Sequence, residues 1–154
     1  MPRVVGLFLV LSLLPCGAGA QTSTTASNKA VARRYFDDIL NQGNVLAIDA
    51  IIAPDVVFRN PPAVVTGIDG FRKLVATLRT AIPDLRFTLQ DELAEGEKVA
   101  TRWVMRGTRD GKKIDVTGMD IFLIAGGKIR EVWVNMDSLG QAQQMGLVPA
   151  APAP

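Results

Sequence analysis

The first half of the chain carries apolar residues at helical spacing. They form one face of a segment from Asn28 to about Asn41, and shorter stretches at 45–52 and 71–82 repeat the pattern. A glycine or proline closely follows each stretch, as is typical of helix ends. Between the second and third stretches, residues 55–60 predict a short strand closed by two prolines. This half therefore predicts three helices and one strand.

The second half changes to a period of two. Apolar and polar residues alternate, and the pairs Asp110-Gly111 and Gly126-Gly127 separate alternating runs in the manner of hairpin turns. The pattern predicts four strands joined by short hairpins, at residues 85–89, 98–108, 114–125 and 128–136. A short terminal helix is expected at 137–145, with Asp137 as its cap.

This order of elements favours an α+β fold. Strands linked by hairpins form a curved antiparallel sheet, and one face of such a sheet needs an apolar cover. The three earlier helices can supply that cover. A strongly curved sheet wrapped over helices leaves a cone with an apolar interior, which is a common place for a ligand site.

The composition is that of one globular domain. The chain has 154 residues, of which 48% are hydrophobic and 21% are charged, so a disordered chain is excluded. The net charge is only +2 and no basic run is interleaved with aromatic residues. We therefore expect no nucleic-acid partner.

The N-terminus has the pattern of an export signal. Arg3 precedes an apolar run, and Ala18-Gly19-Ala20 is a cleavage-site pattern before Gln21. We expect a signal peptide at 1–20, a flexible leader at 21–27, a domain at 28–148 and a disordered tail at 149–154. The mature protein would be periplasmic or secreted and free of the membrane, with lipid anchoring at Cys16 as an alternative.

Two residue types that carry much enzyme chemistry are scarce. The chain contains no histidine, which excludes an imidazole base and the commonest transition-metal ligand. Cys16, inside the expected signal, is the only cysteine, so the mature chain would have no thiol or disulfide. We expect no metal and no cofactor.

Several short motifs, in their order and spacing, resemble SnoaL-like proteins of the NTF2-like superfamily. The resemblance covers residues 28–148 and rests on Phe58-Arg59-Asn60-Pro61-Pro62, Ile82-Pro83-Asp84-Leu85, Gly118-Met119-Asp120-Ile121-Phe122 and Glu131-Val132-Trp133. It implies an NTF2-like cone, dimerisation through the sheet, no cofactor, and often polyketide or ester cyclase activity. A more distant similarity is to limonene-epoxide hydrolase.

The resemblance also bears on single positions. Val132 and Val134 stand where such cyclases usually have a histidine and an acid/base aspartate on the last strand. Asp120, on the neighbouring strand, falls near a second polar position of the family pocket. Phe58 and Asn60 match a Tyr-x-Asn pair of the epoxide hydrolases, in which the asparagine helps to hold water.

Asp120 is the candidate catalytic residue. If it faces the cone, burial favours its neutral form and raises its pKa into the range of an acid or base. The alternative is a position on the solvent or dimer face, paired with an arginine. Tyr35 and Asn60 are expected as polar helpers in ligand binding. The remaining predicted ligand contacts are apolar: Phe58, Trp103, Met105, Val132 and Val134.

Two functions from different classes follow. One is a cofactor-independent cyclase, hydrolase or isomerase that acts on a small apolar carbonyl compound. The alternative is an exported, non-catalytic module that binds a hydrophobic small molecule. A third reading is an interaction domain whose cone is filled by side chains, with no room for a ligand.

Overall fold

The computed structural model describes the backbone of residues 18–149 and the side chains from Thr24 to Pro149. Most of the expected signal peptide (1–20) and nearly all of the expected tail (149–154) lie outside the described residues. Within them, no helix is long and apolar enough to cross a membrane.

The N-terminal helix is longer than the sequence pattern predicts. Helix α1 spans Ala18–Arg34 and therefore includes residues 21–27, which were expected to form a flexible leader. Those residues contain no proline, so nothing in the backbone prevents the helix from extending through them. Asn28 lies inside α1 and caps nothing. Its side chain is buried and its Nδ2 donates a hydrogen bond to the Gly96 carbonyl at 3.1 Å.

A π-helical segment, η1 (Tyr35–Asn41), continues α1 directly. Such segments are rare and often lie at functional sites. The side chains of Tyr35, Phe36, Ile39 and Leu40 are buried. Asn41 ties the end of η1 to the sheet, because its Oδ1 accepts from the Phe87 amide at 2.7 Å and its Nδ2 donates to the Phe87 carbonyl at 3.0 Å.

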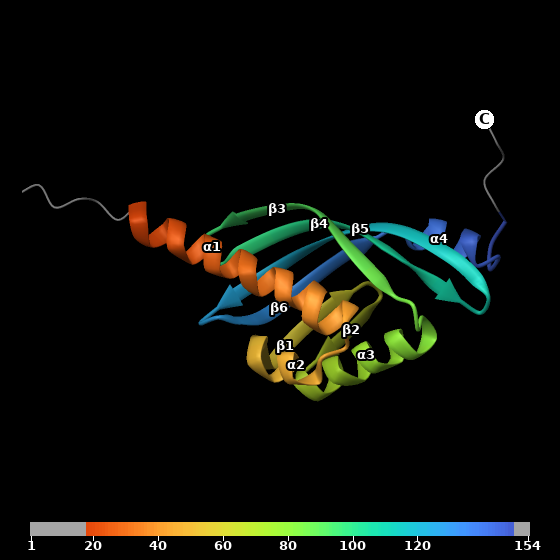
Figure 1. Cartoon of the computed structure of the whole chain (residues 1–154), viewed down its shortest axis with the longest axis horizontal. Helices are drawn as coiled ribbons and strands as arrows, with labels where there is room; N and C mark the ends of the chain where they lie inside the picture. The colour runs from red at the N-terminus through yellow and green to blue at the C-terminus, as the bar shows by residue number, and fades with distance from the viewer. Residues whose placement is uncertain (1–17, 150–154) are drawn as a thin grey trace, which may run out of the picture.

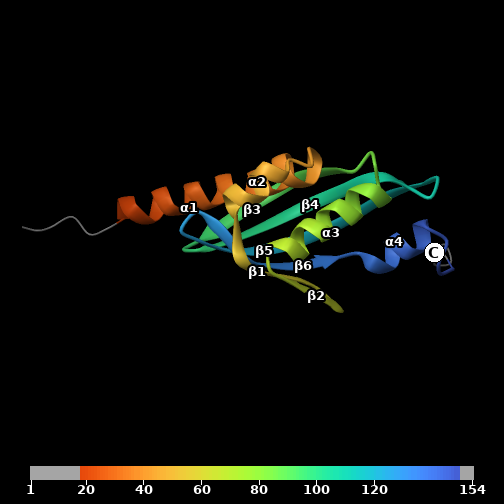
Figure 2. The ribbon, with the colours of Figure 1, turned by 90° about the horizontal axis from the view of Figure 1, so that it is seen from below.

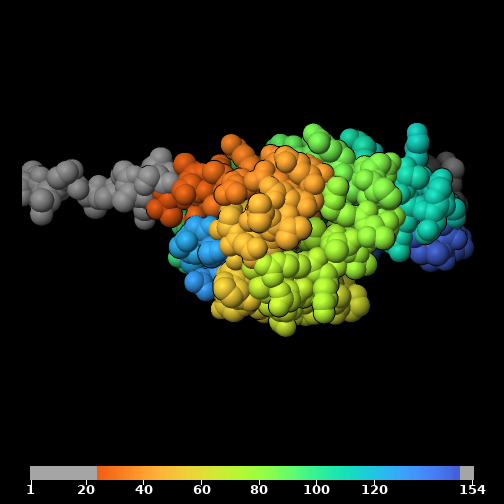
Figure 3. Space-filling model, turned by 60° about the horizontal axis from the view of Figure 1, so that its bottom comes forward, coloured from red at the N-terminus to blue at the C-terminus, as the bar shows by residue number. Residues whose placement is uncertain are grey.

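Two further helices complete the N-terminal cover. Helix α2 (Val45–Ile51) begins at Asn44, whose side chain accepts hydrogen bonds from the amides of Leu46 and Ala47. Helix α3 (Ile68–Ala81) buries Phe71 and Val75 on the face toward the sheet. Figure 3 shows that α1, η1, α2 and α3 form a continuous layer over this face of the molecule.

One six-stranded sheet lies behind these helices (Figure 1). Its strand order is β2-β1-β6-β5-β4-β3. The strands span Ile52–Asn60 (β1), Ala63–Thr66 (β2), Arg86–Glu95 (β3), Lys98–Arg109 (β4), Lys112–Ala125 (β5) and Lys128–Met136 (β6). The last three strands match the predicted ones closely, because their alternation is regular and their hairpin turns contain glycine. At the turn before β5, for example, Asp110 and Gly111 both have positive φ, of 50° and 76°. Strand β3 ends six residues beyond the predicted strand at 85–89, because a shift of register between Leu89 and Asp91 interrupts the alternation.

Two features of the sheet were not predicted. The short strand β2 pairs with β1 in antiparallel register, although the chain was expected to leave the sheet at Pro61-Pro62. In addition, β1 runs parallel to β6, so the sheet is mostly but not wholly antiparallel. Two neighbouring strands can be parallel only if a long connection returns the chain to the end at which the first strand began. Helix α3 and strands β3–β5 lie between β1 and β6 in sequence and provide this connection.

The last helix, α4 (Ser138–Gln144), lies at the end of the molecule beyond β6 (Figure 2). The predicted cap is confirmed, since the Asp137 side chain accepts a hydrogen bond from the Gly140 amide at 2.7 Å. Lys112 and Gln144 bond this helix to β5: the Lys112 Nζ donates to the Met145 carbonyl, and the Gln144 side chain pairs with the Asp115 backbone. Helices and a curved sheet thus form the expected α+β, NTF2-like cone.

Candidate functional site

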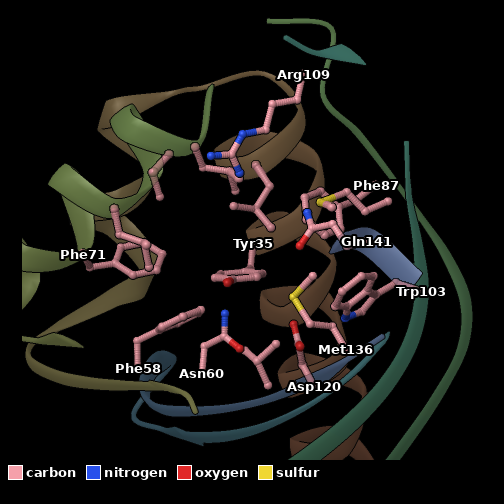
Figure 4. Close-up of a pocket in the computed structure, with 16 residues that line it drawn as sticks. Tyr35, Phe58, Asn60, Phe71, Phe87, Trp103, Arg109, Asp120, Met136 and Gln141 are labelled. Atoms are coloured by element: carbon pink, nitrogen blue, oxygen red, sulfur yellow. The ribbon is translucent and has the colours of Figure 1, made fainter. Parts of the chain in front are cut away.

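A cavity of about 210 Å³ lies between the concave face of the sheet and the helices (Figure 4). Its walls are mostly apolar, so the cone is not filled by side chains. Five polar residues line it: Tyr35, Asn60, Arg109, Asp120 and Gln141. The apolar lining consists of Leu40, Phe58, Phe71, Leu74, Val75, Leu78, Phe87, Trp103, Met105, Val134 and Met136.

Asp120 faces this cavity and is only 3% exposed. Along β5 the even-numbered residues from Ile114 to Ile124 point to the interior, and the odd-numbered ones, including Met119 and Ile121, face outward. Asp120 therefore does not lie on the solvent face beside an arginine. In the sheet it lies directly between Thr101 of β4 and Val134 of β6.

Burial raises the pKa of Asp120 to about 7. The neighbouring Trp103 indole acts in the opposite direction and lowers the pKa of Asp120, although its Nε1 has no hydrogen-bond partner of good geometry in the described part of the chain. The Asp120 Oδ1 and the Thr101 Oγ1 likewise have no partner among the described residues. Buried polar atoms are normally paired, so unpaired ones beside a cavity are available to a ligand or to water.

Tyr35 contributes a phenol at the junction of α1 and η1. Burial, and then the charge of Asp120, raise the pKa of Tyr35 well above its usual value of 10, so the phenol is protonated at neutral pH. Its ring packs edge to face against Phe36 and Phe122, with both ring centroids 5.1 Å away. This packing holds the phenol in place.

Asn60 ends β1 at the same end of the cavity as Asp120 (Figure 4). Figure 4 places its amide below the Tyr35 ring and beside Phe58. The side chains of Tyr35, Asn60 and Asp120 thus come from three different elements and line the same cavity. Together they offer a phenol donor, an amide and a carboxyl group.

The predicted apolar contacts divide into two groups. Phe58, Trp103, Met105 and Val134 line the cavity. Val132 does not, although it is fully buried. It lies between Phe58 and Phe122 in the sheet register and belongs to the core, so the expected ligand contact of Val132 is not supported.

A glycine makes room for the largest lining side chain. Gly118 is the cross-strand partner of Trp103, and a Cβ at this position would lie 2.3 Å from the Trp103 ring. The indole therefore occupies the space where a side chain at residue 118 would be. This explains why the interior positions of β5 include a residue with no side chain.

Sequence reasoning missed two polar lining residues, Arg109 and Gln141. For Arg109 a signal existed, because the odd-numbered residues of β4 from Val99 onward face inward and Arg109 continues that series. For Gln141 no signal existed, since its place depends on where α4 packs. Among the described residues, no group of three or more acidic, histidine or cysteine side chains could hold a metal ion.

Comparisons with known proteins agree on the fold and the family. A model of the SnoaL-like polyketide cyclase family matches residues 30–145. A comparison with curated proteins found no significant match.

Solved structures superpose on most of the chain. A Jannaschia sp. CCS1 protein, provisionally assigned as a SnoaL-like polyketide cyclase, is 20% identical with a TM-score of 0.75, covering 82% of this chain and 96% of its own. A Bacillus cereus ATCC 10987 protein, provisionally assigned as a polyketide cyclase, is 28% identical with a TM-score of 0.72, covering 79% and 82%. TsrD from Streptomyces laurentii is also 28% identical, with a TM-score of 0.72, and the match covers 80% of this chain and 97% of TsrD.

Proposed function

Because the chain belongs to the SnoaL-like polyketide cyclase family, we propose that it is a cofactor-independent, cyclase-type enzyme in which Asp120 transfers protons. Its substrate is a small apolar compound that contains a carbonyl group. One observation carries this proposal: Asp120 is a buried carboxyl group that borders a mostly apolar cavity, and its Oδ1 has no hydrogen-bond partner among the residues that the structure describes.

Asp120 can take the role of the carboxylate that the last strand lacks. Val134 occupies the place where the resemblance puts an acid/base aspartate. Asp120 and Val134 are direct partners across β5 and β6, and such partners have Cβ atoms about 5 Å apart. A carboxyl group moved by one strand therefore still reaches the same part of the cavity.

The chemistry follows from the three polar groups. The Asp120 carboxylate accepts a proton from the carbon beside the substrate carbonyl, and the electron pair of the broken C–H bond passes to the carbonyl oxygen. The Tyr35 phenol, with the Asn60 amide beside it, can donate to the resulting enolate oxygen. The protonated Asp120 then returns its proton to the enolate carbon. In a cyclisation, that carbon instead bonds to a second carbonyl carbon of the substrate, the electron pair of the second C=O bond moves to its oxygen, and the resulting alkoxide takes the proton from Asp120. A pKa near 7 suits both steps at neutral pH.

The first test is exchange of the α-protons of 2-tetralone in D2O, followed by NMR. The wild-type protein should accelerate exchange above the buffer rate. The variant D120N should lose that acceleration by about 100-fold or more, because an amide cannot accept the proton.

The matched control is D115N, which changes an exposed carboxyl on the outer face of the same strand. It should leave the exchange rate unchanged. Equal rates for the wild type and D120N, or no acceleration by either, would show that Asp120 is not the base. Binding of 2-tetralone without exchange would instead favour the non-catalytic binding module.

We also propose a homodimer formed through the outer face of the sheet. Leu93, Met119 and Ile121 are exposed there, at 73%, 52% and 44%. Ile121 lies between Ala100 and Trp133 in the register, so apolar side chains continue across three strands. A second copy of the chain could cover this row.

A further inference from the structure

Arg109 is the one cationic side chain among the residues that line the mostly apolar cavity. It ends β4 and shares the inward parity of Trp103 and Met105. Figure 4 shows its side chain reaching into the cavity from the end opposite Asp120, with Tyr35 between them. Arg109 is 42% exposed, whereas Asp120 is buried, so Arg109 marks the mouth and Asp120 the floor.

Arg109 has only a weak ion pair within the part of the chain that the structure describes. Among the described residues its ion-pair partner is Asp110, at a long distance of 3.8 Å from the Arg109 Nε, and the Asp110 side chain is 84% exposed. The Asp84 carboxylate accepts hydrogen bonds from the amide and hydroxyl of Thr108, the residue before Arg109, at 2.6 and 2.8 Å. The terminal nitrogens of Arg109 thus remain available as donors.

We propose that the ligand of this cavity carries a carboxylate, which Arg109 binds at the mouth while the carbonyl end lies near Asp120. This assignment rests on the proposed function and adds a substrate class to it, namely small apolar keto acids. A guanidinium binds a carboxylate through two parallel hydrogen bonds, which a neutral ester cannot accept in the same way. Gln141 of α4 also lines the cavity and adds a polar side chain to it.

The two ends of the cavity determine the orientation of such a ligand. At the floor, a carboxylate would lie beside the Asp120 carboxyl group, and two buried carboxylates repel one another. At the mouth, it meets a cation in partial contact with solvent. The apolar walls between the two ends, which include Phe71 and Leu78, suit the hydrocarbon part.

The test compares 5-oxo-5-phenylpentanoate with its methyl ester by isothermal titration calorimetry. The wild-type protein should bind the acid more tightly than the ester. In R109Q the affinity for the acid should fall by about tenfold or more, with little change for the ester, because a charge-assisted hydrogen-bonded pair is lost.

The control is R106Q, which removes the same charge from the outer face of the same strand, where Arg106 pairs with Asp115 at 2.7 Å. It should retain the preference for the acid. Unchanged binding of ester by R109Q also shows that the variant is folded. The proposal is overturned if the wild type binds the ester as tightly as the acid, if it binds neither, or if R109Q and R106Q behave alike.

This experiment and the exchange assay can fail separately. An Arg109-dependent preference for the acid, without any exchange of α-protons, would refute the catalytic role of Asp120 and leave Arg109 as the anion site of a binding protein. Exchange that depends on Asp120, without preference for the acid, would refute the assignment of Arg109 alone.

Discussion

At the level of the single residue, burying the carboxyl group of Asp120 costs free energy. Its carboxyl group is taken out of water, and one of its oxygens receives no hydrogen bond from a described residue. Burial therefore favours the protonated form, and the pKa of about 7 lies well above the usual value of 3.8. Strongly shifted pKa values of this kind cluster at catalytic and binding sites.

The shift predicts a dependence of stability on pH. Between pH 4 and 7 the folded state binds a proton at Asp120 that the unfolded state has released, so the free energy of unfolding should fall as pH rises. The loss at pH 8 should be up to about 4 kcal/mol, since one pKa unit corresponds to ~1.4 kcal/mol. D120N lacks this titration, so it should become more stable than the wild type above pH 7.

Urea unfolding at several pH values measures this effect. The difference in unfolding free energy between D120N and the wild type should grow from pH 4 to 7 and then level off. D115N, with its exposed carboxyl, should follow the wild type. A difference that does not vary with pH would mean that Asp120 titrates near its ordinary value.

Parity at Asp120 illustrates what alternation can and cannot predict. The odd-numbered neighbours Thr117, Met119 and Ile121 are about as apolar as the even-numbered ones, so the sequence alone left the inward face ambiguous. The structure decides it, because the helices cover only one face of the sheet. Asp120 faces that cover, and Met119 remains exposed.

At the level of the element, the outer face of β5 is the counterpart of the cavity wall. It carries exposed apolar residues, and ion pairs flank them on the same face of the sheet: Arg102 of β4 pairs with Asp91 of β3, and Arg106 of β4 pairs with Asp115 of β5. We expect the apolar row to be covered by the same row of a second copy. The charged pairs on the same face would then lie around it.

The dimer is tested by size-exclusion chromatography with light scattering. The wild type should have the mass of a dimer at micromolar concentration. I121E should be a monomer, because two buried glutamates would face one another without a partner. The control A76E places the same charge on an exposed position of α3 and should remain a dimer. A wild type that is monomeric at about 100 μM would exclude this interface.

At the level of the whole molecule, the N-terminal segment bears both on the fold, through helix α1, and on the cellular location, through the expected export signal. Helix α1 begins at Ala18, so the expected cleavage site lies within its first turn. We propose that the chain is exported and that cleavage after Ala20 leaves α1 to begin at Gln21. The body of the domain, including the buried Asn28, would remain intact.

Mass spectrometry of the protein from the exported fraction of an expressing cell tests this proposal. The mature chain should begin at Gln21. A chain that keeps residues 1–20, or that stays in the cytoplasm, would contradict the export signal. A mass increase from lipid at Cys16 would identify the alternative of membrane anchoring.

The elements of this fold could be predicted because their causes are local. Periodicity, hairpin glycines and terminating prolines predicted the helices and the last three strands to within a few residues, apart from the early start of α1. Strand β3 extends six residues beyond its predicted end. They also predicted the cap at Asp137. The short strand β2 and the parallel pairing of β1 with β6 escaped prediction because strand pairing depends on distant segments.

The sequence by itself showed that histidine takes no part in the chemistry, and it identified the one candidate carboxyl group and seven of the sixteen residues that line the cavity. Only the tertiary structure decided that Asp120 is buried and that Arg109 and Gln141 share its cavity. It also placed Val132 in the core and outside that cavity. The physical reason is that residue type and alternation are properties of one strand, whereas a cavity exists only where several elements fail to fill the space between them.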